Sequence, residues 1–334
     1  MGYCIEKTRF DEILGELSET YQIYAPRLDA QKRRVRFGKI NSVSQIVTDR
    51  QSDFSAKEVY YPISQVMFYF RDDRVEISEA KDEKDFLIFA RACDINAIRR
   101  LDRIFLENGG AQDLFYKRLR DKVKFVLLEC QESFDECFCV SVGSNIAEDY
   151  SLAMLITDED VKVEIKDGDF EDYFEDEEEY AYHVGFVTEN KKTVRIPQIS
   201  RDNLKTVSEL EFWKQFDEKC LSCGGCNTVC GTCSCFDTVD VIYEEGSNDG
   251  ERRRVWSGCM LDDFTLTAGG SRARKTPGAN MRFKVFHKFY DFKDRFGEEH
   301  MCVGCGRCDI RCPKELSFFD TVCELHDLIE EGAE

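Results

Sequence analysis

The sequence is poor in the residues and segments that mark several common classes of protein. Its 334 residues include five prolines and four histidines, and they contain no low-complexity tract. No apolar run approaches the roughly 20 residues that a membrane-spanning helix needs, and the mean hydropathy is −0.45. The first residues, MGYCIEKTRF, show no apolar signal segment. These absences predict a folded, soluble, cytoplasmic protein that neither crosses a membrane nor contains long disordered regions.

Positive charge is also scarce, since 46 basic residues face 66 acidic ones and the formal net charge is −20. A nucleic-acid binder normally carries a basic surface, so this class is disfavoured. The charge is unevenly spread, with an acidic stretch at residues 167–179 and a basic stretch at residues 252–295. The acidic stretch is interpreted as a solvated loop or hairpin tip, and a docking surface for a basic partner is the alternative.

Cysteine, by contrast, is abundant, with 17 residues. Disulfides need an oxidising compartment, which the sequence does not indicate, so metal chemistry is the better explanation. Eight cysteines form two runs of identical spacing near the C-terminus. These are Cys220, Cys223, Cys226 and Cys230, and then Cys302, Cys305, Cys308 and Cys312.

Both runs match the C-x2-C-x2-C-x3-C-P spacing of bacterial ferredoxins that hold [4Fe-4S] clusters, except that Gly231 replaces the proline after the first run. In two-cluster ferredoxins the fourth cysteine of each run binds the other cluster. The predicted ligands are therefore Cys220, Cys223, Cys226 and Cys312 for cluster 1, and Cys302, Cys305, Cys308 and Cys230 for cluster 2. Structural zinc is the weaker alternative, because its ligands usually come as two separated pairs.

A strand–helix–strand unit is expected in the first half of the chain. Residues 86–90 (FLIFA) and 123–128 (VKFVLL) have the pattern of buried strands, and the segment between them has the apolar stripe of a helix. Strands joined in this way are parallel. Cys93 and Cys130 follow the two strands, so they are predicted at the carboxyl edge of the sheet, where α/β proteins place ligands.

Cys137 and Cys139 follow Cys130 closely, so four cysteines are expected at this edge. We predict that Cys93, Cys130, Cys137 and Cys139 hold a third [4Fe-4S] cluster. A zinc ion at the same residues and ordinary buried cysteines remain open as alternatives. The five remaining cysteines receive no assigned role. These are Cys4, Cys233, Cys235, Cys259 and Cys323.

The predicted fold class is α+β. Residues 1–200 are expected to form an α/β domain with a partly parallel sheet, and residues 201–334 a mainly helical ferredoxin-type domain with a basic insert between the cysteine runs. No nucleophile–base pair or flavin motif is found, so no catalytic residue and no substrate site are predicted. Gly269 and Gly270 lie among arginines but lack a phosphate-loop pattern. The basic insert is therefore interpreted as tuning cluster potentials or docking a partner.

The chain resembles the A subunits of anaerobic sulfite reductases over nearly its whole length. It is similar, more distantly, to the beta subunits of cytoplasmic sulfhydrogenases. Many relatives have proline where Ala92 stands, which leaves the ligands unaffected. Five groups of residues carry most of the resemblance, namely 91–94 (RACD), 137–139 (CFC), both cysteine runs, 232–236 (TCSCF) and 252–270 (RRRVWSGCMLDDFTLTAGG).

The resemblance implies a non-catalytic electron-transfer subunit of an oxidoreductase. It would pass electrons through [4Fe-4S] clusters from a flavin subunit that oxidises NAD(P)H to a sirohaem subunit that reduces sulfite to sulfide. The alternative is the beta subunit of a soluble nickel–iron hydrogenase or sulfhydrogenase. A zinc-organised interaction protein is a third hypothesis, from a different class.

Overall fold

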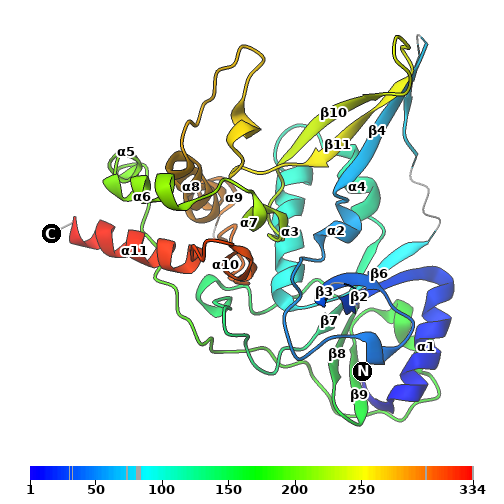
Figure 1. Ribbon diagram of the computed structural model, residues 1–334. Coiled ribbons are helices and arrows are strands. Elements are labelled where there is room, and N and C mark those ends of the chain that lie inside the picture. Colours follow the sequence, from blue (N-terminus) through cyan, green and yellow to red (C-terminus); the bar gives the residue numbers. More distant parts are fainter. Residues whose placement is uncertain (30, 32, 73, 80–83, 298, 333–334) are drawn as a thin grey trace.

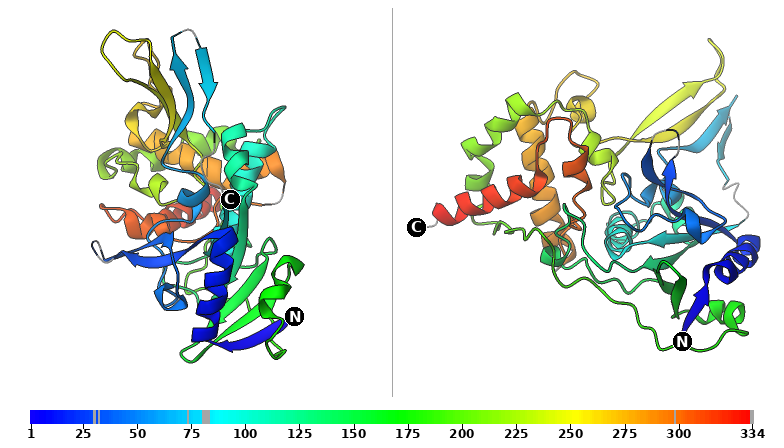
Figure 2. Two further views of the ribbon diagram at one scale, coloured as in Figure 1. Left: turned by 90° about the vertical axis from the view of Figure 1, so that its right-hand side faces the viewer. Right: turned by 60° about the horizontal axis from the view of Figure 1, so that its bottom comes forward.

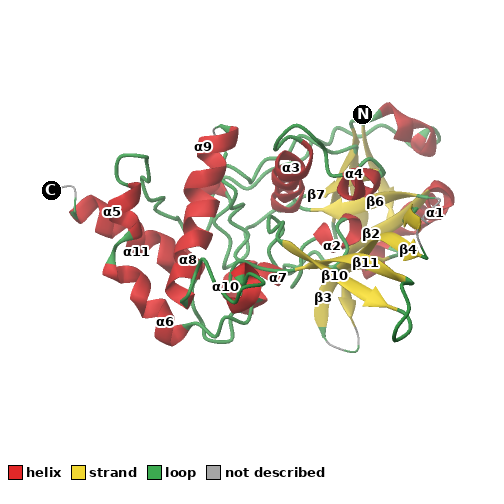
Figure 3. Ribbon diagram, turned by 90° about the horizontal axis from the view of Figure 1, so that it is seen from above, coloured by secondary structure: helices red, strands yellow, loops and turns green. Residues whose placement is uncertain are grey.

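The structure is a computed structural model that describes residues 1–332 except 30, 32, 73, 80–83 and 298. Most strands gather at one end of the molecule and the C-terminal helices at the other, with α7 and α10 between them (Figure 3). Among the described residues, no helix has the length and apolar character needed to cross a bilayer.

A seven-stranded sheet, ordered β1-β9-β8-β7-β6-β2-β3, organises the first half of the chain (Figure 1). The pairs β2–β6, β6–β7 and β7–β8 are parallel, and the other pairs are antiparallel. The expected partly parallel sheet is therefore confirmed. Its strands are β1 (Gly2–Glu6), β2 (Tyr21–Asp29), β3 (Arg34–Lys39), β6 (Asp85–Ala90), β7 (Val123–Leu128), β8 (Leu152–Ile156) and β9 (Asp160–Ile165).

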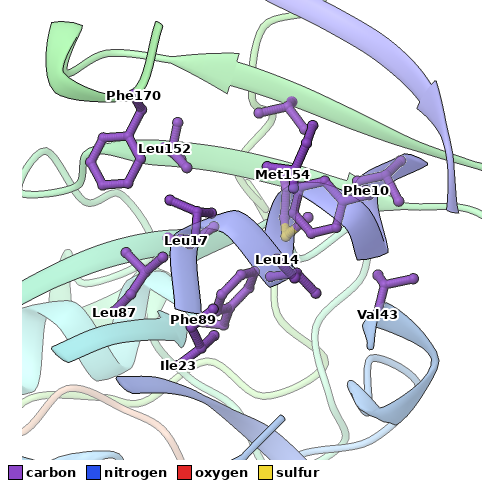
Figure 4. Close-up of a cluster of buried hydrophobic side chains, with 14 of the residues drawn as sticks. Phe10, Leu14, Leu17, Ile23, Val43, Leu87, Phe89, Leu152, Met154 and Phe170 are labelled. Carbon is purple, nitrogen blue, oxygen red and sulfur yellow. The ribbon is translucent and has the colours of Figure 1, made fainter. Parts of the chain in front are cut away.

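Helices cover both faces of this sheet because its central strands are apolar on both sides. On one face, α1 (Lys7–Thr20) packs Phe10, Leu14 and Leu17 against the strands (Figure 4). The other face carries α2 (Lys57–Tyr60), α3 (Ala92–Leu106) and α4 (Leu114–Arg120). Helix α3 is the crossover between the parallel strands β6 and β7, so the predicted strand–helix–strand unit is confirmed.

A second, antiparallel sheet combines strands from both halves of the sequence and projects from the body (Figures 1 and 2). Its order is β10-β11-β4-β5, with strands β4 (Ser64–Arg71), β5 (Arg74–Ile77), β10 (Phe236–Ile242) and β11 (Gly250–Trp256). The hairpin β10–β11 belongs to the C-terminal part, so the prediction of a mainly helical C-terminal domain is not confirmed. The domain boundary at residue 200 stays a prediction.

The remaining helices pack around an apolar core that includes Trp213, Phe216, Val285 and Val322. Helices α8 and α9 are joined without a break by a π-helical turn, His287–Asp291. The helices are α5 (Leu204–Ser208), α6 (Gln215–Lys219), α7 (Gly225–Thr228), α8 (Pro277–Phe286), α9 (Phe292–Phe296), α10 (Arg307–Arg311) and α11 (Phe318–Glu331).

The acidic stretch at residues 167–179 differs from the solvated loop that was expected. Residues Gly168–Phe174 form a 3-10 helix, and Phe170 and Phe174 are fully buried against the seven-stranded sheet. The two aromatic residues anchor the stretch, which leaves most of its carboxylates facing solvent.

Candidate functional site

The two cysteine runs adopt the same loop conformation. Ser222 and Gly224 have φ angles of 50° and 67°, and Gly304 and Gly306, at the equivalent positions, have 60° and 70°. The N–H of Ser222 points at Cys220 Sγ, and the N–H of Gly304 points at Cys302 Sγ, each at 3.4 Å. A short helix, α7 or α10, follows each loop. Backbone N–H groups aimed at cysteine sulfur are one of the means by which proteins tune iron–sulfur sites.

The first site is a cavity that brings together the four cysteines predicted for cluster 1. Three come from the first run and Cys312 comes from the second, and Cys308, predicted for cluster 2, also lines the cavity. The lining is otherwise mainly apolar, including Met260, Met281 and Phe318. Cysteine thiolates gathered in a mainly apolar cavity are the donor set of a [4Fe-4S] cluster, so the residues fit that group.

The second site brings together the three leading cysteines of the second run and Cys230 of the first. Burial, with smaller contributions from the neighbouring Cys305 and Cys230, raises the pKa of Cys302 to about 12. A hydrogen bond from Cys233 holds the pKa of Cys230 well below its ordinary value, and Lys288 and Lys57 act in the same direction. Cys230 is thus prepared as a thiolate, the form that binds iron.

The third site lies at the carboxyl ends of β6 and β7. Cys93, Cys130, Cys137 and Cys139 line one cavity there, as the sequence predicted. Burial raises the pKa of Cys137 to about 12, with further contributions from Cys139 and Cys305. Two side chains that the sequence did not indicate also reach the site. Asn190 Nδ2 lies 3.5 Å from Cys139 Sγ, and the buried Arg91 interacts with Cys130.

The side chain of Arg91 holds a loop that forms part of the wall of this cavity. Its guanidinium donates to the carbonyls of Thr48 and Arg50, at 3.0 and 3.2 Å. These contacts hold the loop that carries Gln51, whose Nε2 donates to the carbonyl of Cys305 at 2.7 Å. A buried guanidinium also favours negative charge nearby, which suits a set of four thiolates.

A single zinc ion and a cubane make different demands on the positions of the four sulfurs. Zinc–sulfur bonds of about 2.3 Å in tetrahedral geometry require sulfurs about 3.8 Å apart. Across the described ranges, no three histidine, cysteine, aspartate or glutamate side chains are placed to hold one metal ion. A cubane binds each thiolate through a different iron, so it accepts a wider range of distances between the four sulfurs.

The second and third sites are in direct contact. The N–H of Phe138 donates to the carbonyl of Gly304 at 2.8 Å, and Cys137 Sγ lies 3.9 Å from the carbonyl oxygen of Cys305. Cys93, Cys139 and Cys305 share a small buried core. Because the second site also shares both cysteine runs with the first, the three sites follow one another with the second in the middle.

Glycine at position 304 is required by this contact. A Cβ there would lie 2.6 Å from the carbonyl carbon and oxygen of Phe138, whereas at Gly224 it would meet only Leu261 Cδ2, at 2.7 Å. We expect Gly304→Ala and Gly224→Ala to share a cost of about 1–2 kcal/mol for the left-handed conformation. The backbone clash should add roughly 1–3 kcal/mol at position 304 alone. Thermal unfolding of the two variants measures the difference, and equal midpoints would contradict the close approach.

The unassigned cysteines line neither the first nor the third cavity, although Cys233 contacts Cys230 of the second site. Asn227 Nδ2 lies 3.4 Å from Cys233 Sγ and 3.3 Å from Cys259 Sγ. Cys4 Sγ lies 3.2 Å from Asp160 on the edge of the large sheet, and Cys323 is buried in α11.

Comparison with known proteins agrees with this geometry in the C-terminal part. Residues 219–316 match the 4Fe-4S dicluster domain family. The chain carries two [4Fe-4S] clusters. It is also 28% identical to the sulfhydrogenase 2 subunit beta of Pyrococcus furiosus, over 95% of this chain and 96% of that subunit. No solved structure matches the chain. The protein is thus an iron–sulfur protein related to the sulfhydrogenase beta subunit, and a relation to sulfite reductase rests on the sequence resemblance alone.

Proposed function

We propose that this chain is the electron-transfer subunit of an oxidoreductase complex and relays single electrons through three [4Fe-4S] clusters. One observation carries the proposal, namely that three cysteine-lined sites follow one another and that the loops of the second and third touch. A [4Fe-4S] cluster supplies one-electron redox chemistry when bound. The ligands are those predicted from the sequence. The dicluster family match supports the two C-terminal clusters, whereas the third cluster rests on the sequence pattern and on the cavity that its four cysteines line.

The chain's own residues hold and insulate the redox groups. Apolar side chains such as Met260, Met281 and Phe318 keep water from the first site, which fixes the local dielectric. Direct contact between the loops of the second and third sites keeps those sites close. No residue is assigned to substrate chemistry, so donor and acceptor are expected on partner subunits.

Two complexes are candidates. The similarity to a sulfhydrogenase beta subunit favours a nickel–iron hydrogenase partner. The resemblance to anaerobic sulfite reductase favours a sirohaem subunit that reduces sulfite to sulfide. Both assignments include a flavin subunit that oxidises NAD(P)H and a cytoplasmic location, and the sulfhydrogenase has the support of the comparison as well as of the resemblance.

Purification of the complex from its native host under anaerobic conditions separates the two candidates. Nickel in the complex identifies a hydrogenase, and sirohaem identifies a sulfite reductase. The purified chain alone should show iron–sulfur absorbance and EPR signals but should neither oxidise hydrogen nor reduce sulfite. Turnover of either substrate by the chain alone would overturn its role as a relay.

The third cluster has a test of its own. Changing Cys137 and Cys139 together to serine removes two of its four proposed ligands, so the iron content should fall by about four per chain. The control is Cys4→Ser with Cys323→Ser, two cysteines that contact Asp160 and the backbone of Arg195 rather than a proposed ligand, and this variant should leave the iron content unchanged. An unchanged iron content in the first variant would show that the sheet edge holds no cluster.

A further inference from the structure

Three buried lysines lie around the two C-terminal cysteine sites. Lys57, Lys284 and Lys288 are only 3%, 3% and 2% exposed. They come from different parts of the chain, since Lys57 belongs to α2 beneath the large sheet, while Lys284 and Lys288 lie on α8 and the π-helical turn that follows it. The structure therefore places cations from both halves of the protein in one interior region.

No carboxylate neutralises these ammonium groups in the part of the chain that the structure describes. Lys57 Nζ donates to the carbonyl of Cys233 at 3.0 Å and lies 4.0 Å from the Trp256 ring centre. Lys288 Nζ donates to Thr232 Oγ1 at 2.6 Å. Lys284 lines the first cysteine cavity, with its Nζ 4.4 Å from the Phe318 ring centre. Their partners are neutral groups and cysteines.

Burying an unpaired ammonium group costs several kcal/mol, so three of them require negative charge close by. The cysteine sites are where that charge lies. Lys284 interacts with Cys226 of the first run and Cys308 of the second. Lys288 interacts with Cys230 and Cys302. Burial lowers the pKa of Lys57, and the nearby Cys233 and Cys230 oppose this shift by favouring the charged ammonium. A [4Fe-4S] core held by four thiolates is anionic, and it becomes more so when it gains an electron.

We propose that Lys57, Lys284 and Lys288 are buried counter-charges that raise the reduction potentials of the two C-terminal clusters. Lys284 acts on both clusters, whereas Lys57 and Lys288 act on the second. Each ammonium stabilises the reduced form more than the oxidised form, because the reduced form carries the larger negative charge. This inference rests on the proposed function, in that both sites must bind clusters.

The three lysines also bear on how electrons distribute along the relay. The second site, in the middle, receives charge from all three lysines, since its ligands include Cys230, Cys302 and Cys308. It should therefore be easier to reduce than it would be with its cysteines alone, and electrons should collect there. Because Lys57 comes from α2, the potential of this cluster also depends on correct packing between the two halves of the chain.

The test is a redox titration of the anaerobically purified holoprotein, followed by EPR. For Lys288→Met, the midpoint potential of one C-terminal cluster should fall by at least 59 mV, a tenfold change in its oxidised-to-reduced ratio for a one-electron couple. Lys284→Met should lower the potentials of both clusters. The matched control is Lys293→Met, because Lys293 lies on the following helix but is exposed.

Potentials equal to those of the Lys293→Met control, in variants that retain full iron content, would overturn the proposal. If Lys288→Met does not assemble its clusters, Lys57→Met provides the same test from the other half of the chain and should also lower the potential of the second cluster. An unchanged potential there would overturn the proposal equally. Failure of the proposed function would look different, because the purified chain would then oxidise hydrogen or reduce sulfite by itself.

Discussion

Replacing Cys305 with serine is expected to interrupt the relay at its middle station. Serine is a poor iron ligand, so the variant should lose the second cluster, about four irons per chain. NAD(P)H-driven turnover of the native complex should then fall by at least about 100-fold. Loss of a residue that only supports a metal ligand commonly costs up to about 100-fold, and here a ligand itself is lost. The effect is large because the second site contacts the third directly, through the loop that contains Gly304.

The control for this experiment is Cys4→Ser. Cys4 lies on β1, an edge strand of the large sheet, with its sulfur beside Asp160 and remote from the three cavities. This variant should keep both its iron and its turnover. Full turnover by a Cys305→Ser complex that lacks the second cluster would mean that electrons take another path, and the proposed order of stations would be wrong.

Replacing Arg307 with methionine is expected to produce the largest loss of stability. Arg307 Nη1 lies 2.8 Å from Asp94 Oδ1, and the two side chains are only 2% and 1% exposed. Arg307 Nε also donates to the carbonyl of Ser52 at 2.9 Å. The pair joins the loop of the second site to α3. Removing one partner of a buried pair leaves an uncompensated charge and costs about 3–5 kcal/mol.

Thermal unfolding of the holoprotein, together with the rate of iron release, measures this loss. Arg311→Met is the matched control, because Arg311 lies on the same helix α10 but is exposed, and it should change the stability by less than about 0.5 kcal/mol. A double variant, Arg307→Met with Asp94→Leu, should recover part of the loss because no charge is left unpaired. Equal melting of Arg307→Met and Arg311→Met would contradict the role given to the pair.

The parts of the site that sequence predicted well are those that local spacing determines. Cubane-binding loops need cysteines three residues apart, so both runs were recognisable without any knowledge of the fold. The strand–helix–strand unit was equally visible, because apolar runs and an apolar helical stripe alternate between residues 86 and 128. It placed Cys93 and Cys130 on the same sheet edge, where the structure has them.

The parts that sequence could not predict depend on contacts between distant segments. Burial of a lysine has no local pattern, so Lys57, Lys284 and Lys288 read as ordinary surface residues until the two halves are packed together. Strand β11 pairs with β4, although more than 170 residues separate them in the sequence.

A proline inside a strand is also hard to foresee from sequence. Pro26 lies within β2, past the last residue that pairs with β6, so its missing N–H disturbs no hydrogen bond between these two strands.

Counting iron and acid-labile sulfide per chain after anaerobic purification tests most directly whether the chain is a relay of three [4Fe-4S] clusters. Three clusters require about twelve of each. About eight of each would remove the third station and reduce the relay to its C-terminal pair. A colourless protein with zinc and no sulfide would contradict the claim altogether.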